Sequence, residues 1–200
     1  MKAALISIRP EWCAKIASGD KSIEVRKTRP KLETPFKCYI YCTQVSVKYQ
    51  TICGCHVLNS DELYRHPEQG IKHGDSIELM LCEHYTKDNF LNGKVIGEFI
   101  CDRIYELETR SPGGSYYVKG EGRPTTNDVA RQSCLTPKDM HEYLQSKVGY
   151  GWHISDLKVY DKPRELGSFT GLRDTKFGAA PYDIKRAPQS WCYVEETGND

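Results

Sequence analysis

Three ionisable side chains near the start of the chain have types and spacing that could do chemistry. Lys21, Glu24 and Arg26 follow a glycine at position 19. If this stretch is a strand, Glu24 and Arg26 lie on the same face, about 7 Å apart along the strand, with Lys21 at its beginning. A carboxylate between two cations stays ionised. Such a patch could bind a phosphate through its cations, and a base edge or a hydroxyl through Glu24.

The same spacing also fits an exposed, salt-bridged strand face that contributes little energy. The chain of 200 residues has a formal net charge of +1, which excludes a strongly basic, histone-like binder. Residues 1–50 nevertheless hold ten Lys and Arg against four Asp and Glu, whereas residues 51–100 hold four against eight. This basic first quarter predicts either a local anion-binding surface or a solvated basic face without a partner.

Apolar patterning and turn residues predict the elements that would position the patch. A continuous apolar run predicts a strand over 3–8. A short helix should follow over 10–18, because Pro10 suits its first position and Gly19 suits its end. Apolar and polar residues then alternate over 22–27, which predicts a half-buried strand.

The rest of the chain combines strands, a second helix and long connections. The expected strands are 36–43, 50–58, 94–107, 152–161 and 190–195, with weak strand character over 76–81. The second helix is expected over 137–147, with Thr136 as its N-cap. Residues 108–133 and 162–186 are expected to be irregular.

Two helices and six or seven strands predict an α+β fold, a small mixed or largely antiparallel β-barrel flanked by short helices. We expect a single domain over 1–200, with an insertion at the acidic segment 59–92, which could contact a protein partner. No apolar run approaches the roughly 20 residues of a membrane span. The apolar stretch at the N-terminus is too short for a signal peptide. We therefore expect a cytoplasmic protein.

The nine cysteines indicate an intracellular protein without a disulfide framework, because their number is odd and no secretion signal is present. We expect no cofactor and no metal. A metal site would have to draw on Cys38, Cys42, Cys53, Cys55 and the adjacent His56, but their spacing differs from the usual paired zinc motif. Buried free thiols are the alternative.

Two residues in the strand predicted over 152–161 are further candidates. Trp152 could stack on a base or belong to the core. His153 could act as a general base, contact a base edge or make a structural hydrogen bond. The tyrosines of the loop 111–117 could close over a flipped base or form a plain hairpin. The candidate binding residues are Arg9, Lys21, Glu24, Arg26, Lys27, Arg29, Trp152 and His153.

The pattern G-x-K-x-x-E-x-R resembles the signature of the ASCH family, which belongs to the PUA-like superfamily. The chain matches it at Gly19, Lys21, Glu24 and Arg26. Further similarity lies in S-I-R-P-x-W at 7–12, G-W-H-I at 151–154 and P-Q-S-W-C at 188–192. The resemblance covers roughly residues 3–58, 94–107 and 134–195, and such chains occur in bacteria and in phage and prophage genomes.

This resemblance implies a pseudo-barrel of five or six strands, with a cleft lined by the motif residues. Relatives bind RNA, or modified bases in DNA or RNA. One small bacterial relative is an amidohydrolase that removes the acetyl group from acetylated cytidine, and another has been described as a ribonuclease. In the amidohydrolase the motif lysine, matched here by Lys21, works with a nearby threonine and a more distant glutamate. The position of that threonine is Glu24 in this chain.

Two functions are therefore expected for the same cleft. The first is binding of RNA, another single-stranded nucleic acid or a modified nucleoside, with Lys21 and Arg26 on the phosphate and Glu24 on the base. The second is hydrolysis of a modified nucleoside amide or of RNA, with Lys21 stabilising an oxyanion and Glu24 moving protons.

Overall fold

The structure is a computed structural model of the chain. It describes residues 1–44, 91–109, 114–120 and 124–197, together with the backbone of three short strands between 49 and 80. Two compact units make up the chain: a first unit of Met1–Ser18, Lys37–Phe99 and Leu157–Asp200, and a second unit of Gly19–Phe36 and Ile100–Asp156. Among the described residues, no helix is long and apolar enough to cross a membrane.

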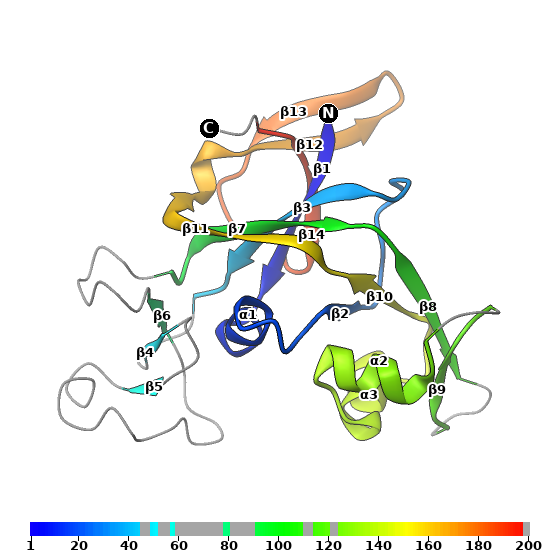
Figure 1. Cartoon of the computed structure of the whole chain (residues 1–200). Coiled ribbons are helices and arrows are strands. Elements are labelled where there is room, and N and C mark those ends of the chain that lie inside the picture. Colours follow the sequence, from blue (N-terminus) through cyan, green and yellow to red (C-terminus); the bar gives the residue numbers. More distant parts are fainter. Residues whose placement is uncertain are drawn as a thin grey trace. The chain divides into compact units, whose positions relative to one another are not determined.

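A seven-stranded sheet lies in the first unit, except for a few residues at the ends of its strands that belong to the second unit (Figure 1). In spatial order its strands are β11 (Ser155–Glu165), β7 (Lys94–Cys101), β3 (Phe36–Cys42), β1 (Lys2–Ile8), β14 (Trp191–Glu195), β12 (Thr170–Thr175) and β13 (Gly178–Asp183). The sheet is mixed, because β1 pairs in parallel with β3 and antiparallel with β14. Its core includes the buried side chains of Leu5, Tyr39, Val95, Phe169 and Val194.

Shorter elements complete the first unit. Helix α1 (Pro10–Ala17) begins with proline, whose missing N–H costs nothing at this position. A 3-10 helix, η2 (Leu166–Ser168), follows β11. Strands β4 (Tyr49–Thr51), β5 (Val57–Leu58) and β6 (Glu78–Met80) form a separate three-stranded sheet.

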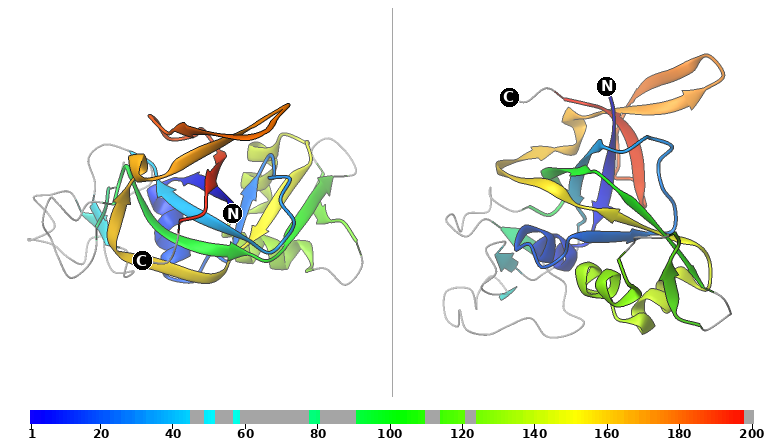
Figure 2. Two further views of the ribbon diagram at one scale, coloured as in Figure 1. Left: turned by 90° about the horizontal axis from the view of Figure 1, so that it is seen from above. Right: turned by 45° about the vertical axis from the view of Figure 1, so that its right-hand side comes forward.

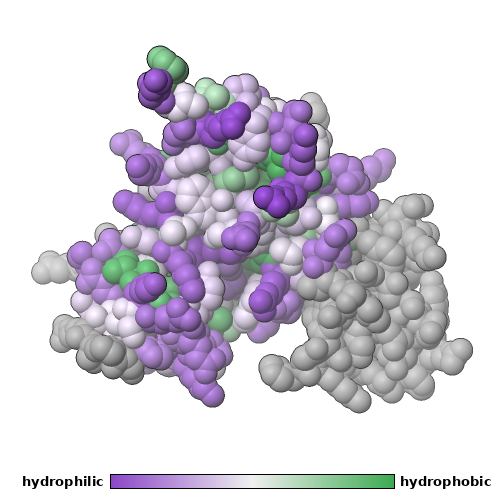
Figure 3. Space-filling model, turned by 180° about the vertical axis from the view of Figure 1, so that it is seen from behind, coloured by the Kyte–Doolittle hydropathy of each residue, from purple (hydrophilic) through white to green (hydrophobic). Residues whose placement is uncertain are grey.

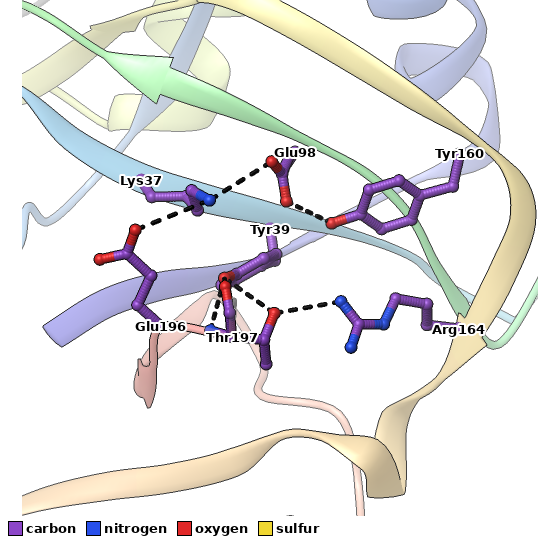
Figure 4. A network of polar contacts seen from close by, with 7 residues as sticks. All are labelled: Lys37, Tyr39, Glu98, Tyr160, Arg164, Glu196 and Thr197. Carbon is purple, nitrogen blue, oxygen red and sulfur yellow. Dashed lines mark hydrogen bonds and ion pairs between the residues drawn. The ribbon is translucent and has the colours of Figure 1, made fainter. Parts of the chain in front are cut away.

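A polar network fixes the last described residues of the first unit (Figure 4). Thr197 donates its backbone N–H to the Tyr39 hydroxyl at 2.9 Å, and Arg164 donates to the Thr197 hydroxyl at 3.0 Å. Lys37 lies 3.4 Å from Glu98 and 3.6 Å from Glu196. Burial alone would lower the pKa of Lys37, but the neighbouring carboxylates outweigh it and raise that pKa. The network therefore ties the segment after β14 to β3, β7 and β11.

The second unit consists of a four-stranded sheet covered by two helices (Figures 1 and 2). The sheet order is β2 (Ile23–Arg26), β10 (Gly149–His153), β8 (Ile104–Thr109) and β9 (Tyr116–Val118), and the helices are α2 (Thr126–Ser133) and α3 (Pro137–Leu144). Thr125 and Thr136 each form a capping box with the aspartate three residues on. Ile23 and Val25 pack into one core cluster with the helix residues Val129, Met140 and Leu144.

Strand register divides this sheet into two faces. In β10, Trp152 opposes Glu24 and Tyr150 opposes Arg26. Because directly opposed residues share a face, these side chains point away from the helices. We call this side the polar face and define it by Glu24, Arg26, Ile104, Glu106, Tyr150 and Trp152.

The predicted α+β class is confirmed, since the described chain is mostly strands in sheets with a few short helices. Over the described residues, the seven-stranded sheet ends at β11 on one side and at β13 on the other. Three α-helices are present in the described part, rather than the two expected. Helix α2 and strand β9 lie within 108–133, and the β12–β13 hairpin lies within 162–186, so these regions are not irregular as predicted.

Two long strands predicted from apolar patterning are each broken in two. The strand expected over 94–107 divides into β7 and β8, and that over 152–161 into β10 and β11. The two breaks lie side by side, because His153 donates its backbone N–H to the Arg103 carbonyl at 2.9 Å and its ring contacts Asp102. Residues 50–58 are likewise not one strand, since β4 and β5 pair antiparallel; residues 52–56 lie outside the described residues.

Candidate functional site

The three motif side chains converge, but inside the second unit rather than on a surface. Lys21 Nζ lies 3.2 Å from Glu24 Oε2, and Arg26 Nε lies 3.0 Å from Glu24 Oε1. Their side chains are 2%, 9% and 10% exposed for Lys21, Glu24 and Arg26. We call these residues the buried triad. Both cations share one carboxylate, an arrangement that holds Glu24 in place from two sides.

A helix end supplies a further partner for the buried triad. Lys21 Nζ donates to the backbone carbonyl of Ser133 at 2.6 Å, and Ser133 is the last residue of α2. The last carbonyls of a helix have no intrahelical partner and carry the negative end of its dipole. The Lys21 ammonium therefore caps α2. The Ser22 N–H, which donates to Gln132 at 2.9 Å, fixes the same junction.

Strand β2 is buried along its whole length, so the prediction of a half-buried strand is wrong. Its apolar residues face the helices, as the alternation indicated. Its polar residues, Glu24 and Arg26, are covered as well. Alternation identified the two faces correctly but gave no sign that ion pairing would let the polar face be buried too.

Trp152 and His153 are neighbours in β10 but lie on opposite faces of the sheet. Trp152 opposes Glu24 and is fully buried, with its ring in edge contact with Phe36 at a centroid distance of 6.0 Å. His153 opposes Ile23 on the helix side. The sheet therefore brings Trp152, and not His153, together with Glu24 and Arg26.

His153 instead forms a pair with Asp102. Its Nδ1 lies 2.5 Å from Asp102 Oδ1, and Arg103 Nε lies 3.2 Å from the other carboxylate oxygen. Burial alone would raise the pKa of Asp102, but these two partners outweigh it and lower that pKa. An ionised Asp102 accepts a hydrogen bond from the Nδ1–H of His153, and this contact fixes the orientation of the ring.

The second unit carries an open pocket of about 870 Å³ beside the motif. It is lined by the loop 27–34 together with Ile104 and Tyr150, both on the polar face. The loop contributes three cations, Lys27, Arg29 and Lys31, against one carboxylate, Glu33. Its Pro30 is buried and anchors the loop. Arg29 lies over the Tyr150 ring at 5.9 Å from the ring centroid.

Sequence reasoning named Lys27 and Arg29 as candidates but missed Lys31 and Tyr150. Lys31 belongs to the same basic stretch as the other two, which was a usable signal. Tyr150 lies two residues before Trp152, and strand alternation places both on one face. Starting the strand at 149 instead of 152 would have revealed this relationship.

Several predicted residues lie elsewhere. Arg9 belongs to the first unit, where its side chain is exposed and lies 4.0 Å from Glu11. In the loop 111–117, residues 111–113 are outside the described residues. Tyr116 and Tyr117 lie in β9 and donate to the Lys147 carbonyl and to Glu108, respectively.

No metal cluster is found in the described residues, where no three His, Cys, Asp or Glu side chains gather closely enough to hold an ion. Cys38 and Cys42 are buried free thiols in β3. Cys53 and Cys55 lie outside the described residues, as do the side chains of the predicted insertion up to residue 90. The metal alternative for these cysteines and the partner role of 59–92 stay predictions.

Comparison with known proteins gives structural similarity without sequence matches. No protein-family profile matches the sequence, and no curated protein matches it. Among solved structures, the chain is similar to a crystal structure of ASCH from Zymomonas mobilis, with a TM-score of 0.46 and 14% identity, covering 97% of this chain and 88% of that one. A single-substitution mutant of the same Zymomonas mobilis protein gives a TM-score of 0.46 and 15% identity, covering 98% and 92%.

Proposed function

We propose that the protein binds RNA or another single-stranded nucleic acid in the pocket of the second unit. The observation that carries this proposal is the lining of the pocket, with three cations, one carboxylate and an aromatic ring around about 870 Å³. Binding pockets for small organic ligands occupy roughly 300–1,000 Å³, so a nucleotide fits this range. Three cations and an aromatic ring together match the successive phosphates and one base of a short single strand.

Each part of the lining can contact one part of a nucleic acid. The guanidinium of Arg29 can hold a phosphate with two parallel hydrogen bonds, while Lys27 and Lys31 act as point charges. Tyr150 offers a ring on which a base can stack, an interaction that tolerates any base. Glu33 can accept a hydrogen bond from an amino group on a base edge. A modified base would be distinguished by the same edge contacts.

The buried triad positions this pocket rather than touching the ligand. Arg26 immediately precedes Lys27, and its guanidinium is fixed by Glu24. Glu24 in turn forms an ion pair with Lys21, which donates a hydrogen bond to the last residue of α2. The strand that leads into the loop 27–34 is therefore rigid. A preorganised loop loses less conformational entropy when it binds.

The G-x-K-x-x-E-x-R pattern supports the same proposal, because the ASCH proteins it resembles belong to a superfamily whose members bind RNA or modified bases. We accordingly propose an ASCH-type, PUA-like protein of bacterial or phage kind that acts in the cytoplasm. In this chain the motif's contribution is structural, and the contacts with nucleic acid come from the basic loop that follows it.

Fluorescence anisotropy with a labelled single-stranded RNA and a DNA of the same sequence tests the proposal. The triple variant Lys27→Ala, Arg29→Ala, Lys31→Ala should bind more weakly and reduce the salt slope, log Kd against log salt, by about 2, because each single-strand phosphate contact contributes about 0.7. The control is Lys138→Ala, which removes an exposed cation of α3 in the same unit. Unchanged affinity and slope in the triple variant would exclude this pocket.

A further inference from the structure

A hairpin of the first unit presents an aromatic side chain at its tip. Phe177 is 90% exposed and lies in the two-residue turn between β12 and β13. Figure 3 shows this hairpin projecting at the top of the molecule, with a small hydrophobic patch at its outer end beside hydrophilic surface. The turn is ordered by Thr175, whose hydroxyl donates to the Gly178 carbonyl at 2.7 Å and accepts from the Phe177 N–H at 3.2 Å.

The base of the hairpin is closely packed. Gly171 of β12 opposes Tyr182 of β13, and the tyrosine ring lies directly on the glycine. A Cβ at position 171 would lie 2.3 Å from Tyr182 Cζ, so this packing requires glycine. The Arg173 guanidinium also lies over the Tyr182 ring, 5.9 Å from the ring centroid. The tip thus extends from a closely packed base.

A second pocket, of about 680 Å³, lies where the hairpin returns to the sheet. It is lined by residues 182–189, including the exposed cations Lys185 and Arg186. Ile184 is buried in the core of the first unit and anchors the loop. Ser7 fixes its far end, because the Ser7 hydroxyl donates to the Pro188 carbonyl at 2.6 Å.

We propose that the hairpin tip and this loop form a second contact surface for single-stranded nucleic acid. Phe177 stacks on a base, Lys176 contacts the adjoining phosphate, and Lys185 with Arg186 bind phosphates further along the strand. Phe177 and Tyr182, which lines the pocket, are five residues apart along the hairpin. A strand rises 3.3–3.4 Å per residue, so these two residues are separated by about 17 Å. A few nucleotides of extended single strand cover such a span. This inference rests on the proposed function and extends it to the first unit.

Charge favours this occupant over a protein or a membrane. The arm and its loop present four cations, Arg173, Lys176, Lys185 and Arg186, against two carboxylates. Asp174 forms an ion pair with Lys2 at 2.5 Å, and Asp183 lines the pocket, so cations remain in excess. A lone phenylalanine buries too little area to hold a protein partner, whose stable interfaces bury about 1,200 Å² or more. By contrast, one aromatic ring with a cation beside it is enough to stack on a single nucleobase.

The test compares tip variants on a labelled single-stranded RNA of about 12 nucleotides and on an abasic strand of equal length. Phe177→Ala should weaken binding to the RNA about tenfold, since stacking on an aromatic ring gives effects of this size. It should leave the abasic strand unaffected, and Phe177→Tyr should bind like the wild type. The variant Lys185→Ala, Arg186→Ala should weaken both strands, with Lys162→Ala, an exposed cation of β11, as the control.

The outcomes separate this inference from the proposed function. If the wild type binds and the loop 27–34 variant weakens binding while Phe177→Ala does not, the hairpin contact is wrong and the pocket of the second unit stands. If the wild type binds no strand, both are wrong. Phe177-dependent binding to anionic vesicles, with RNA binding unchanged, would also overturn the hairpin contact. Circular dichroism confirms that each tip variant is folded.

Discussion

Trp152 and Glu24 occupy directly opposed positions on β10 and β2, so a fully buried indole and a buried carboxylate share one face of the same sheet. An ionised carboxylate beside an indole, away from water, is costly unless other charges and hydrogen bonds compensate it. Lys21 and Arg26 supply that compensation. The motif therefore lets a strand with two charged residues be packed on both faces.

Glu24→Gln should lower the free energy of unfolding by about 3–5 kcal/mol, because it leaves two buried cations without their carboxylate. Urea denaturation followed by circular dichroism measures the loss. The change keeps the size and shape of the side chain, so any loss reports the charge.

The matched control for that change is Glu142→Gln, which removes the carboxylate of an exposed pair with Lys138. Such pairs on a helix surface contribute about 0.5 kcal/mol or less, so the control should unfold almost like the wild type. Equal losses in the two variants would contradict the burial and pairing of the triad.

The hydrolase alternative would require a substrate to reach Lys21 and Glu24, whose side chains are almost completely buried. We expect no release of acetate from acetylated cytidine and no cleavage of RNA between pH 6 and 9. Chromatography of the nucleoside and gel electrophoresis of the RNA measure these reactions. Turnover that disappears in a folded Lys21→Met variant would instead establish the hydrolase.

Elements defined by local patterns could be predicted well from the sequence. Strand β3 follows from its dense aromatic and β-branched residues, and α3 begins at Pro137 after the cap Thr136, as predicted. Helix α2 carried an equally usable signal, since Thr125 is followed three residues later by Asp128 in a capping box. The glycines and prolines around it suggested a loop and outweighed that signal.

Features that depend on contacts between distant residues could not be predicted. The breaks between β7 and β8 and between β10 and β11 coincide with the pairing of Asp102 and His153, which are 51 residues apart. Arg26 is likewise covered by a distant part of the chain, since Tyr150 of β10 lies directly opposite it. The pocket needs Tyr150 from a strand more than a hundred residues beyond the basic loop.

Gly97→Ala should destabilise the first unit by about 1–3 kcal/mol, the usual cost of overpacking a closely packed interior. A Cβ at this position would lie 2.5 Å from the Lys158 carbonyl oxygen, where β7 passes β11, and backbone cannot move aside as a flexible side chain can. Gly167→Ala is the control, because a Cβ there meets nothing within 4 Å. Thermal unfolding compares the two; similar midpoints would mean that β7 and β11 do not approach so closely.

Asp102→Asn should cost about 2 kcal/mol at pH 5, since hydrogen bonds to a charged group contribute about 1.5–3 kcal/mol. The pKa of Asp102 is lowered in the folded chain, so its carboxylate stabilises the fold above its ordinary pKa of about 3.9, and this stabilisation is lost as the pH falls through the lowered value. The difference in unfolding free energy between wild type and variant should therefore shrink from pH 5 to pH 2. Urea denaturation at each pH measures it, with the exposed Asp161→Asn as the control. A difference that stays constant over this range would show that the charge of Asp102 does not hold His153 at the two strand breaks.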